Sequence, residues 1–405
     1  MLAAEPTSTA ANAINALGID LFRRACRPQA NALLSPYSIQ SALVMAYAGA
    51  EGDTRAEMAK TLHFPHDDAE AHRLFALLPN PLDKVGQLSA KEAEALKQWR
   101  ETNDRITLCV ANQLFGQIGY EFRDVFLNLV RNNYDAPFEA LDFARNASGA
   151  TRHINLWVEE KTRRRICNLI PDGALGNLTR LVLVNALYLK APWTMEFSES
   201  ATQLRQFYLG GSRPIAVPTM TGRHNVSYVK RDGFSVAAIP FGEGEIQFLI
   251  LLPDELNGLA ELEMELSAGL LAECAHPGGH EVLLYLPKLK IEPPVVSLGK
   301  ELQALGMSSA FDQPRGSANF DRMAPRRSED YLYLSEVYHK ALLILDEKGA
   351  EATAATMLEM RVGHGASEKP IEVRVDHPFI FAIQYRASGA CLFLGRVTDP
   401  RGARA

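Results

Sequence analysis

The stretch Asp346-Glu-Lys-Gly-Ala-Glu-Ala-Thr-Ala-Ala-Thr-Met-Leu-Glu359 follows a strand-like run and precedes a loop broken by glycine and proline. Its even positions from Ala350 to Leu358 are small or apolar, whereas its odd positions include the polar Glu351 and Thr353. That period of two is typical of a strand with one face on a core. The alanine content is also compatible with a surface helix or an extended loop. The stretch is therefore a candidate switch element, able to lie outside the fold or to become a strand within it.

The composition of the chain argues against nucleic acid and membranes as its partners. The chain has 405 residues, 47% hydrophobic and 22% charged, which is typical of a soluble globular protein. A net charge of -6 without long runs of one sign argues against nucleic acid as a partner. Every apolar run is shorter than the ~18 residues that cross a bilayer, so no membrane partner is expected. The N-terminus lacks the features of a signal peptide, which predicts either an extracellular or periplasmic protein whose signal was removed, or a cytoplasmic one.

The cysteines do not form a recognisable framework. They are Cys26, Cys109, Cys167, Cys274 and Cys391. Their number is odd, their spacing is wide and no C-x-x-C pair occurs, so we predict buried free thiols rather than disulfides or a metal site. No cofactor is expected either. Glycosylation sequons begin at Asn146, Asn177 and Asn225.

Periodicity places helices mainly in the first half of the chain and strands mainly in the second. Helices are predicted at 12–24, 36–48 and 151–162, with Ser35 and Pro36 starting the second of them. Thr54 and Glu57 have the spacing of a capping box, which predicts the start of a further helix after 36–48. Strands are predicted at 106–115 and 181–189, and most segments after residue 207 are strand-like. Because βαβ alternation and linkers are both missing, we predict one α+β domain spanning 1–405.

The motifs of common enzymes are absent. The sequence contains no G-x-S-x-G, no H-E-x-x-H, no P-loop and no G-x-G-x-x-G after a strand. Catalytic triads are spatial rather than sequential, so an unrelated hydrolase remains a weak alternative. We predict that the protein is not an enzyme.

Several motifs follow one another in an order that is specific as a set. They lie at 31–39, 49–54, 154–162, 183–193 with Phe197, 286–288, 376–381 and 393–397 with Pro400. Through them the chain resembles the serpin family over essentially its whole length. The resemblance implies the serpin fold, in which helices pack around three mainly antiparallel sheets and a reactive-centre loop, here about 347–375, is exposed.

The resemblance also implies that the protein is a suicide inhibitor of serine proteases, with cysteine proteases as further targets. The protease would form an acyl-enzyme with the loop, and the cleaved loop would then insert into the main sheet and trap this covalent complex. The inhibitor would be a metastable monomer. The alternative is a non-inhibitory serpin that acts as a carrier, a chaperone or a protease substrate. The basic run at 163–165 lies outside the usual glycosaminoglycan region of the family, so no heparin dependence is expected.

The resemblance assigns a hinge to the opening stretch. Its residues are Glu347, Gly349, Ala350, Glu351, Ala352, Thr353, Ala354, Ala355 and Thr356. Gly349 would be a flexible pivot. The even positions would face the core after insertion and must be small, because a buried unpaired charge costs several kcal/mol. The family often has threonine where this chain has Ala350, and alanine keeps the small size.

Two further sites are assigned by resemblance. Ser35, Ser38, Asn185 and His339 match the shutter, a polar cluster under the centre of the sheet. Such a cluster could re-pair as strands part and act as a gate, or could be a static, satisfied part of the core. Trp193 matches the breach, where insertion begins.

The scissile bond is placed only as a window, formed by Met360, Arg361, Val362, Gly363 and His364. Family spacing points to Gly363-His364, but the segment from the hinge to Asp376-His377-Pro378-Phe379 is a few residues longer than the common pattern. Cleavage after Arg361 would suit a trypsin-like protease. Cleavage after Met360 would suit a chymotrypsin- or subtilisin-like enzyme, and cleavage after Val362 an elastase-like one.

Overall fold

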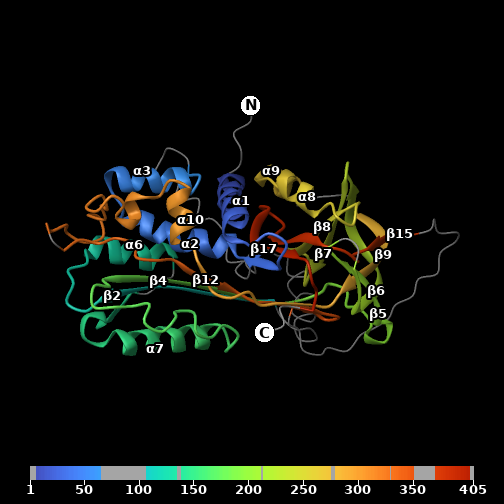
Figure 1. Ribbon diagram of the computed structural model, residues 1–405, viewed down its shortest axis with the longest axis horizontal. Helices are drawn as coiled ribbons and strands as arrows, with labels where there is room; N and C mark the ends of the chain where they lie inside the picture. Colours follow the sequence, from blue (N-terminus) through green and yellow to red (C-terminus); the bar gives the residue numbers. More distant parts are fainter. Residues whose placement is uncertain are drawn as a thin grey trace, which may run out of the picture.

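The computed structural model describes residues 6–64, 106–134, 138–210, 213–274, 279–328, 330–350 and 370–401. The molecule is elongated, with most helices around one end of a long sheet and a second set of strands at the other end (Figure 1). The helices are α1 (Pro6–Ala25), α2 (Pro36–Gly49), α3 (Gly52–Thr61), α6 (Asp124–Tyr134), α7 (Phe143–Lys161), α8 (Leu259–Glu265), α9 (Ala268–Glu273) and α10 (Gly299–Ala304), with 3-10 turns η2 (Glu199–Ala201) and η3 (Ser309–Phe311). The predicted α+β class is confirmed.

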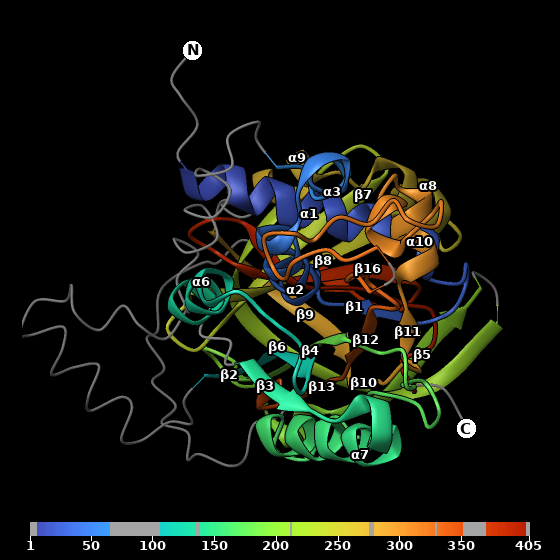
Figure 2. The same ribbon diagram turned by 90° about the vertical axis from the view of Figure 1, so that its left-hand side faces the viewer.

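An eight-stranded sheet is built around β4. Its strands are β2 (Thr107–Gln117), β3 (Phe138–Leu141), β4 (Leu181–Pro192), β10 (Leu289–Ile291), β11 (Val296–Ser297), β12 (Tyr338–Ala341), β13 (Leu343–Asp346) and β14 (Gly349–Ala350). β4 is buried along nearly its whole length because helices cover both faces of the sheet. Figures 1 and 2 show α7 on one face and α2 and α6 on the other.

A nine-stranded sheet occupies the other end of the molecule. Its strands are β1 (Ala32–Leu34), β5 (Gln203–Leu209), β6 (Arg213–Lys230), β7 (Phe234–Phe241), β8 (Ile246–Pro253), β9 (Gly279–Pro287), β15 (Ile371–Arg374), β16 (Phe379–Tyr385) and β17 (Ala390–Val397). The long strand β6 pairs with β5, β9 and β7 in turn, and so joins two groups of strands into one hydrogen-bonded set. Pairing is antiparallel throughout the described strands, except for β2–β3, β4–β12 and β9–β15.

The core follows from apolar runs that the sequence makes obvious. β8 and β17 are buried at every position, and β16 lies between them. At the start of α2, the Ser35 side chain accepts a hydrogen bond from the backbone N–H of Ser38, as the sequence predicts. Among the described residues, no helix combines the length and the apolarity that a membrane crossing requires.

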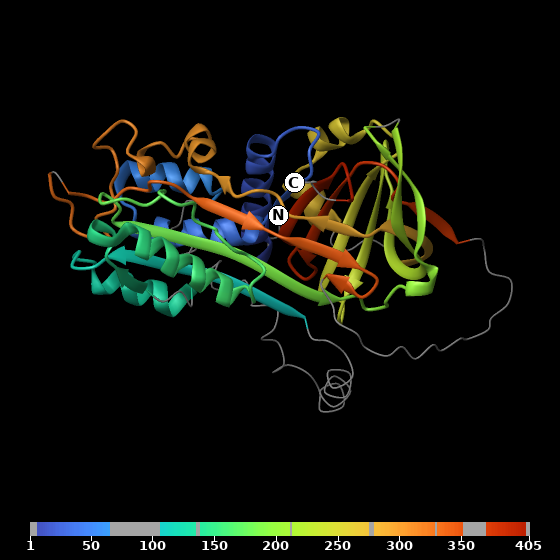
Figure 3. The ribbon, with the colours of Figure 1, turned by 60° about the horizontal axis from the view of Figure 1, so that its bottom comes forward.

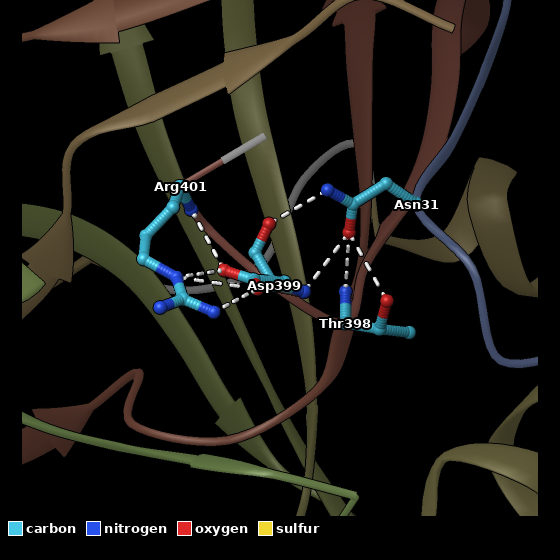
Figure 4. A network of polar contacts seen from close by, with 4 residues as sticks. All are labelled: Asn31, Thr398, Asp399 and Arg401. Atoms are coloured by element: carbon cyan, nitrogen blue, oxygen red, sulfur yellow. Dashed lines mark hydrogen bonds and ion pairs between the residues drawn. The ribbon is translucent and has the colours of Figure 1, made fainter. Parts of the chain in front are cut away.

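The segment that contains Asn31 and the segment that follows β17 lie side by side. Asn31 precedes β1, which pairs with β17, and its side chain donates to the Asp399 carbonyl at 2.6 Å. The oxygen of the Asn31 side-chain amide accepts from the backbone N–H groups of Thr398 and Asp399. Arg401 forms an ion pair with the Asp399 carboxylate (Figure 4). The first and last resemblance motifs are thus parts of one structural unit.

Two local predictions need correction. Thr54 and Glu57 match the pattern of a capping box, but α3 begins earlier, at Gly52, and its N-cap makes no side-chain hydrogen bond. Thr54 accepts from the Asn319 backbone, and Glu57 accepts from Ser309. Of the four cysteines described, Cys274 and Cys391 are buried free thiols, whereas Cys26 and Cys167 are partly exposed.

Candidate functional site

The hinge begins inside the eight-stranded sheet. β14 lies between β13 and β4 and pairs antiparallel with both, so that Gly349 faces Pro192 and Ala350 faces Ala191. Ala350 is fully buried and packs in the same apolar cluster as Ala191. Figure 3 shows β12 and β13 running beside β4 toward this point. The gap between β4 and β13 is therefore already occupied by the first two strand residues of the predicted hinge.

Gly349 is required by this geometry. Its φ is +132°, a region that side chains rarely adopt, and a Cβ there would lie 2.2 Å from the Ala191 carbonyl oxygen. The same Cβ would lie 2.7 Å from the backbone nitrogen of Trp193. The predicted pivot is thus the point where the chain turns into the sheet with no room for a side chain.

Trp193 holds the turn that leads into β14. Its indole Nε1–H donates to the Asp346 carbonyl at 2.9 Å, and its backbone N–H donates to the Lys348 carbonyl at 2.8 Å. The indole is buried and stacks on Phe241 with ring centroids 4.4 Å apart. The residue predicted for the breach is therefore a rigid support for the first residues of the hinge.

Glu347 is a buried carboxylate with two side-chain donors. The residue is 6% exposed, and its oxygens accept from the Thr202 hydroxyl and the Lys288 ammonium, each at 2.7 Å. Burial raises the pKa of Glu347, but the hydrogen bonds from Lys288 and Thr202 outweigh burial and hold the pKa below its ordinary value. Three separate parts of the chain are thus fastened together at the start of the hinge.

The predicted shutter residues come together beneath β4. The Ser38 hydroxyl donates to the Asn185 side-chain oxygen at 2.7 Å, and the Asn185 amide donates to the Ser38 carbonyl and to Asn112. The His339 Nε2 accepts from the Ser35 backbone N–H at 3.1 Å. The structure brings these side chains into one network, and their role as a gate stays a prediction.

His339 is in an unusual state for a histidine. It is 1% exposed, its Nδ1 has no hydrogen-bond partner in the described structure, and burial lowers the pKa to about 3. Because the ring is neutral at ordinary pH, Nε2 can accept the hydrogen bond from Ser35. This bond ties the start of α2 to β12.

Sequence reasoning missed four partners of these sites. Asn112 is a polar residue inside a predicted strand, and that contrast could have marked it as a partner of Asn185. Lys288 belongs to a resemblance motif but received no role, and Thr202 carries no sequence signal. His224 packs on Phe197, with ring centroids 4.1 Å apart, close to the breach.

Part of the predicted site lies outside the described residues. This holds for the hinge from Glu351 to Thr356 and for the whole scissile window from Met360 to His364. The three sequon asparagines are exposed. Within the described part of the chain, no group of three or more His, Cys, Asp or Glu side chains is arranged to hold a metal ion.

The described part of the chain combines a helix-covered sheet, in which the short strand β14 lies between β4 and β13, with a second sheet at the other end of the molecule. A family model described as Serpin (serine protease inhibitor) matches residues 12–400. The leukocyte elastase inhibitor of Bos taurus is 33% identical over 97% of this chain and 99% of its own length. The chain belongs to the serpin family.

Solved structures agree on the fold. Serpin48 of Tenebrio molitor superposes with a TM-score of 0.78 at 29% identity, covering 98% of this chain and 99% of the other. Human thyroxine-binding globulin, solved in complex with its ligand, gives a TM-score of 0.80 at 26% identity over 98% and 99%. Serpins are protease inhibitors by family and are not enzymes, and their partners are proteases in general. The family also contains members with other roles, as the binding globulin shows.

Proposed function

We propose that this serpin is a suicide inhibitor of serine proteases, with cysteine proteases as further targets, and that it works as a monomer. The observation that carries the proposal is β14. Gly349 and Ala350 pair with β4 on one side and β13 on the other, and this supports the proposal because loop insertion would lengthen this short strand. A loop cleaved near residues 360–364 would extend this strand and trap the acyl-enzyme.

The register of β14 sets the path of the proposed insertion. If the strand continues along β4 unchanged, Ala352 would lie opposite Leu189, and Met360 would lie opposite Leu181, the first residue of the strand. Glu351 would lie opposite Lys190, on the other side of the sheet from Ala350. The pattern of small residues and the charge of Glu351 both suit the strand beside which they would be placed.

The path also requires β4 to separate from β12. These two strands pair in parallel at Lys340–Ala186 and Ala341–Leu187, directly below the residues occupied by β14. Asn185 on β4 and His339 on β12 immediately precede the paired residues, and each is hydrogen-bonded to the start of α2. This position supports the gate interpretation of the shutter, because the start of α2 is hydrogen-bonded to both strands, and moving the strands apart would break the bond to at least one of them.

The experiment is incubation with trypsin, chymotrypsin, elastase and subtilisin. We expect an SDS-stable complex with at least one of them, and the intact mass of the released C-terminal peptide then identifies the scissile bond. Cleavage without a complex by all four proteases, together with a cleaved form that melts no higher than the intact one, would reject the inhibitor and favour the non-inhibitory alternative.

A matched pair of variants tests insertion itself. Ala352→Arg would place a charge on the buried side of the new strand, at a cost of several kcal/mol, and we expect it to turn the inhibitor into a cleaved substrate. Thr353→Arg places the same charge on the opposite face and should leave most of the complex intact. An equal yield of complex from both variants would contradict the proposed hinge orientation.

A further inference from the structure

A polar cavity of about 700 Å³ lies at the end of β4 that is remote from the hinge. Its walls come from the residues just before β4, from the segment after η3 and from the chain that leads into β12. Along β4, this cavity is roughly 35 Å from β14, at about 3.3 Å per residue. It is therefore separate from the hinge, and its volume is typical of a small-molecule site.

The cavity has one more arginine than it has acidic residues, and Arg326 among them donates to the carbonyls of Ala318 and Gly316. Arg180, Arg315 and Arg326 line it together with two aspartates. Asp312 is occupied, because its carboxylate accepts from the backbone N–H of Gly316 at 2.7 Å and from the Tyr331 hydroxyl at 3.0 Å.

The second acid is also occupied. Asp330 accepts from Arg180 Nε at 3.2 Å. Arg315, by contrast, is exposed and makes no hydrogen bond or ion pair with any residue that the structure describes. An incoming anion would therefore meet a guanidinium group free to bind it, while both carboxylates already accept hydrogen bonds from the protein.

Aromatic surfaces complete the cavity. Tyr331 and Tyr333 have ring centroids 6.4 Å apart, and the Arg326 guanidinium lies 4.7 Å from the centre of the Tyr331 ring. Tyr333 is 39% exposed and Leu178, at the rim, is 70% exposed, which are large values for apolar side chains. Such surfaces suit a flat ring better than a bare ion.

We propose that this cavity binds a small anion that carries an aromatic ring, with a carboxylate or a phosphate as the charged group. The charged group of the anion would pair with Arg315 and with the remaining N–H groups of Arg180 and Arg326. The ring would lie against Tyr333 and Leu178. A nucleoside monophosphate and an aromatic dicarboxylate share this chemistry.

The site has a consequence for inhibition, which rests on the proposed function. The Arg180–Asp330 ion pair joins the segment that leads into β4 to the segment that leads into β12. Those strands must part during insertion. A ligand that fits the present arrangement stabilises it, and so it would slow insertion rather than promote it.

Isothermal titration calorimetry on the full chain tests the site with three probes: adenosine 5'-monophosphate, benzene-1,3-dicarboxylate and inorganic phosphate. We expect saturable binding of at least one ring-bearing probe, tighter than that of phosphate. Arg315→Ala should weaken it about tenfold or more, the loss expected for a charge-assisted hydrogen bond. Arg152→Ala, which removes an exposed arginine on α7, is the matched control and should bind like the parent.

Tyr333→Ala separates the ring from the charge, because it should weaken the ring-bearing probes and leave phosphate unchanged. Failure of both ring-bearing probes to bind would overturn the proposal, as would binding that Arg315→Ala leaves unaltered. Equal affinity for phosphate and the ring-bearing probes would overturn the ring assignment. Binding does not depend on inhibition, so a protein that binds the probe but forms no protease complex retains the site and loses only the proposed function.

Discussion

The hydrogen bonds from Lys288 and Thr202 to the buried Glu347 carboxylate predict how much the free energy of unfolding changes when one of them is removed. The carboxylate is 6% exposed and both of its side-chain donors lie at 2.7 Å. Lys288→Met removes the ammonium group and keeps much of the aliphatic stem, leaving one buried carboxylate oxygen without its donor. A hydrogen bond to a charged group contributes about 1.5–3 kcal/mol. The Lys288 side chain is 41% exposed, so water can replace part of it, and we expect a loss near the lower end, about 1.5 kcal/mol.

A double-mutant cycle isolates this contribution. Glu347→Gln and Lys288→Met should each destabilise the protein, and the double variant should be less unstable than their sum by about 1 kcal/mol. The assay is the first urea-induced transition, followed by tryptophan fluorescence, because Trp193 contacts the backbone on both sides of Glu347. Lys290→Met is the control, since Lys290 lies two residues away with a long, exposed pair at 3.8 Å and should cost less than about 0.5 kcal/mol.

The pH dependence gives a second readout of the same contact. The folded pKa of Glu347 lies below its ordinary value of 4.5, so the unfolded chain binds the proton first. The stability contributed by this carboxylate is present above pH 4.5 and is lost as the pH falls through the folded pKa. Lys288→Met should flatten the curve in that window. Strictly additive effects in the cycle, or an unchanged pH profile, would refute the reasoning.

Three further predictions concern the sites around the hinge. Gly349→Ala should lower the free energy of unfolding by about 3 kcal/mol or more and remove hydrogen-exchange protection at Trp193, because the new Cβ would lie 2.2 Å from the Ala191 carbonyl oxygen. The control Gly119→Ala, at a φ of +77° with open space around it, should lower it by only about 1 kcal/mol. Asn185→Ala should lower the free energy of unfolding by about 2–4 kcal/mol, because it leaves the buried Ser38 hydroxyl and the Asn112 side chain without Asn185 as a partner. Asn177 is exposed, so the control Asn177→Ala should leave the urea titration unchanged. His224 is neutral in the fold because burial lowers its pKa from 6.5 to about 4, so the free energy of unfolding should fall by about 3 kcal/mol as the pH falls from 6.5 to 4. The urea midpoint of His224→Gln should depend less on pH over this range, and the same pH dependence as in the parent protein would contradict this origin.

Local sequence was sufficient for much of the fold. The Ser35-Pro36 pair starts α2 because a serine oxygen and a proline satisfy or remove the free N–H groups of a helix start, wherever the helix lies. The apolar runs that become β4, β8 and β17 are continuous because both of their faces are covered. The small residues of the hinge also mark it, since Ala350 fits a fully buried position in a sheet. These features depend on neighbouring residues or on burial alone.

The partners of those residues were decided only by the tertiary structure. Glu347 is 145 residues from Thr202 and 59 from Lys288, and no periodicity connects such distant positions. Thr54 and Glu57 have the spacing of a capping box, yet each forms its hydrogen bonds with a segment more than 200 residues away. The same holds for Gly349, whose need for glycine comes from the carbonyl of Ala191. The sequence by itself determined which segments are helices, strands and a small-residue hinge, because local sterics and burial act on neighbours. Which side chains fasten the hinge depends on long-range packing, and that is fixed only when the whole chain has folded.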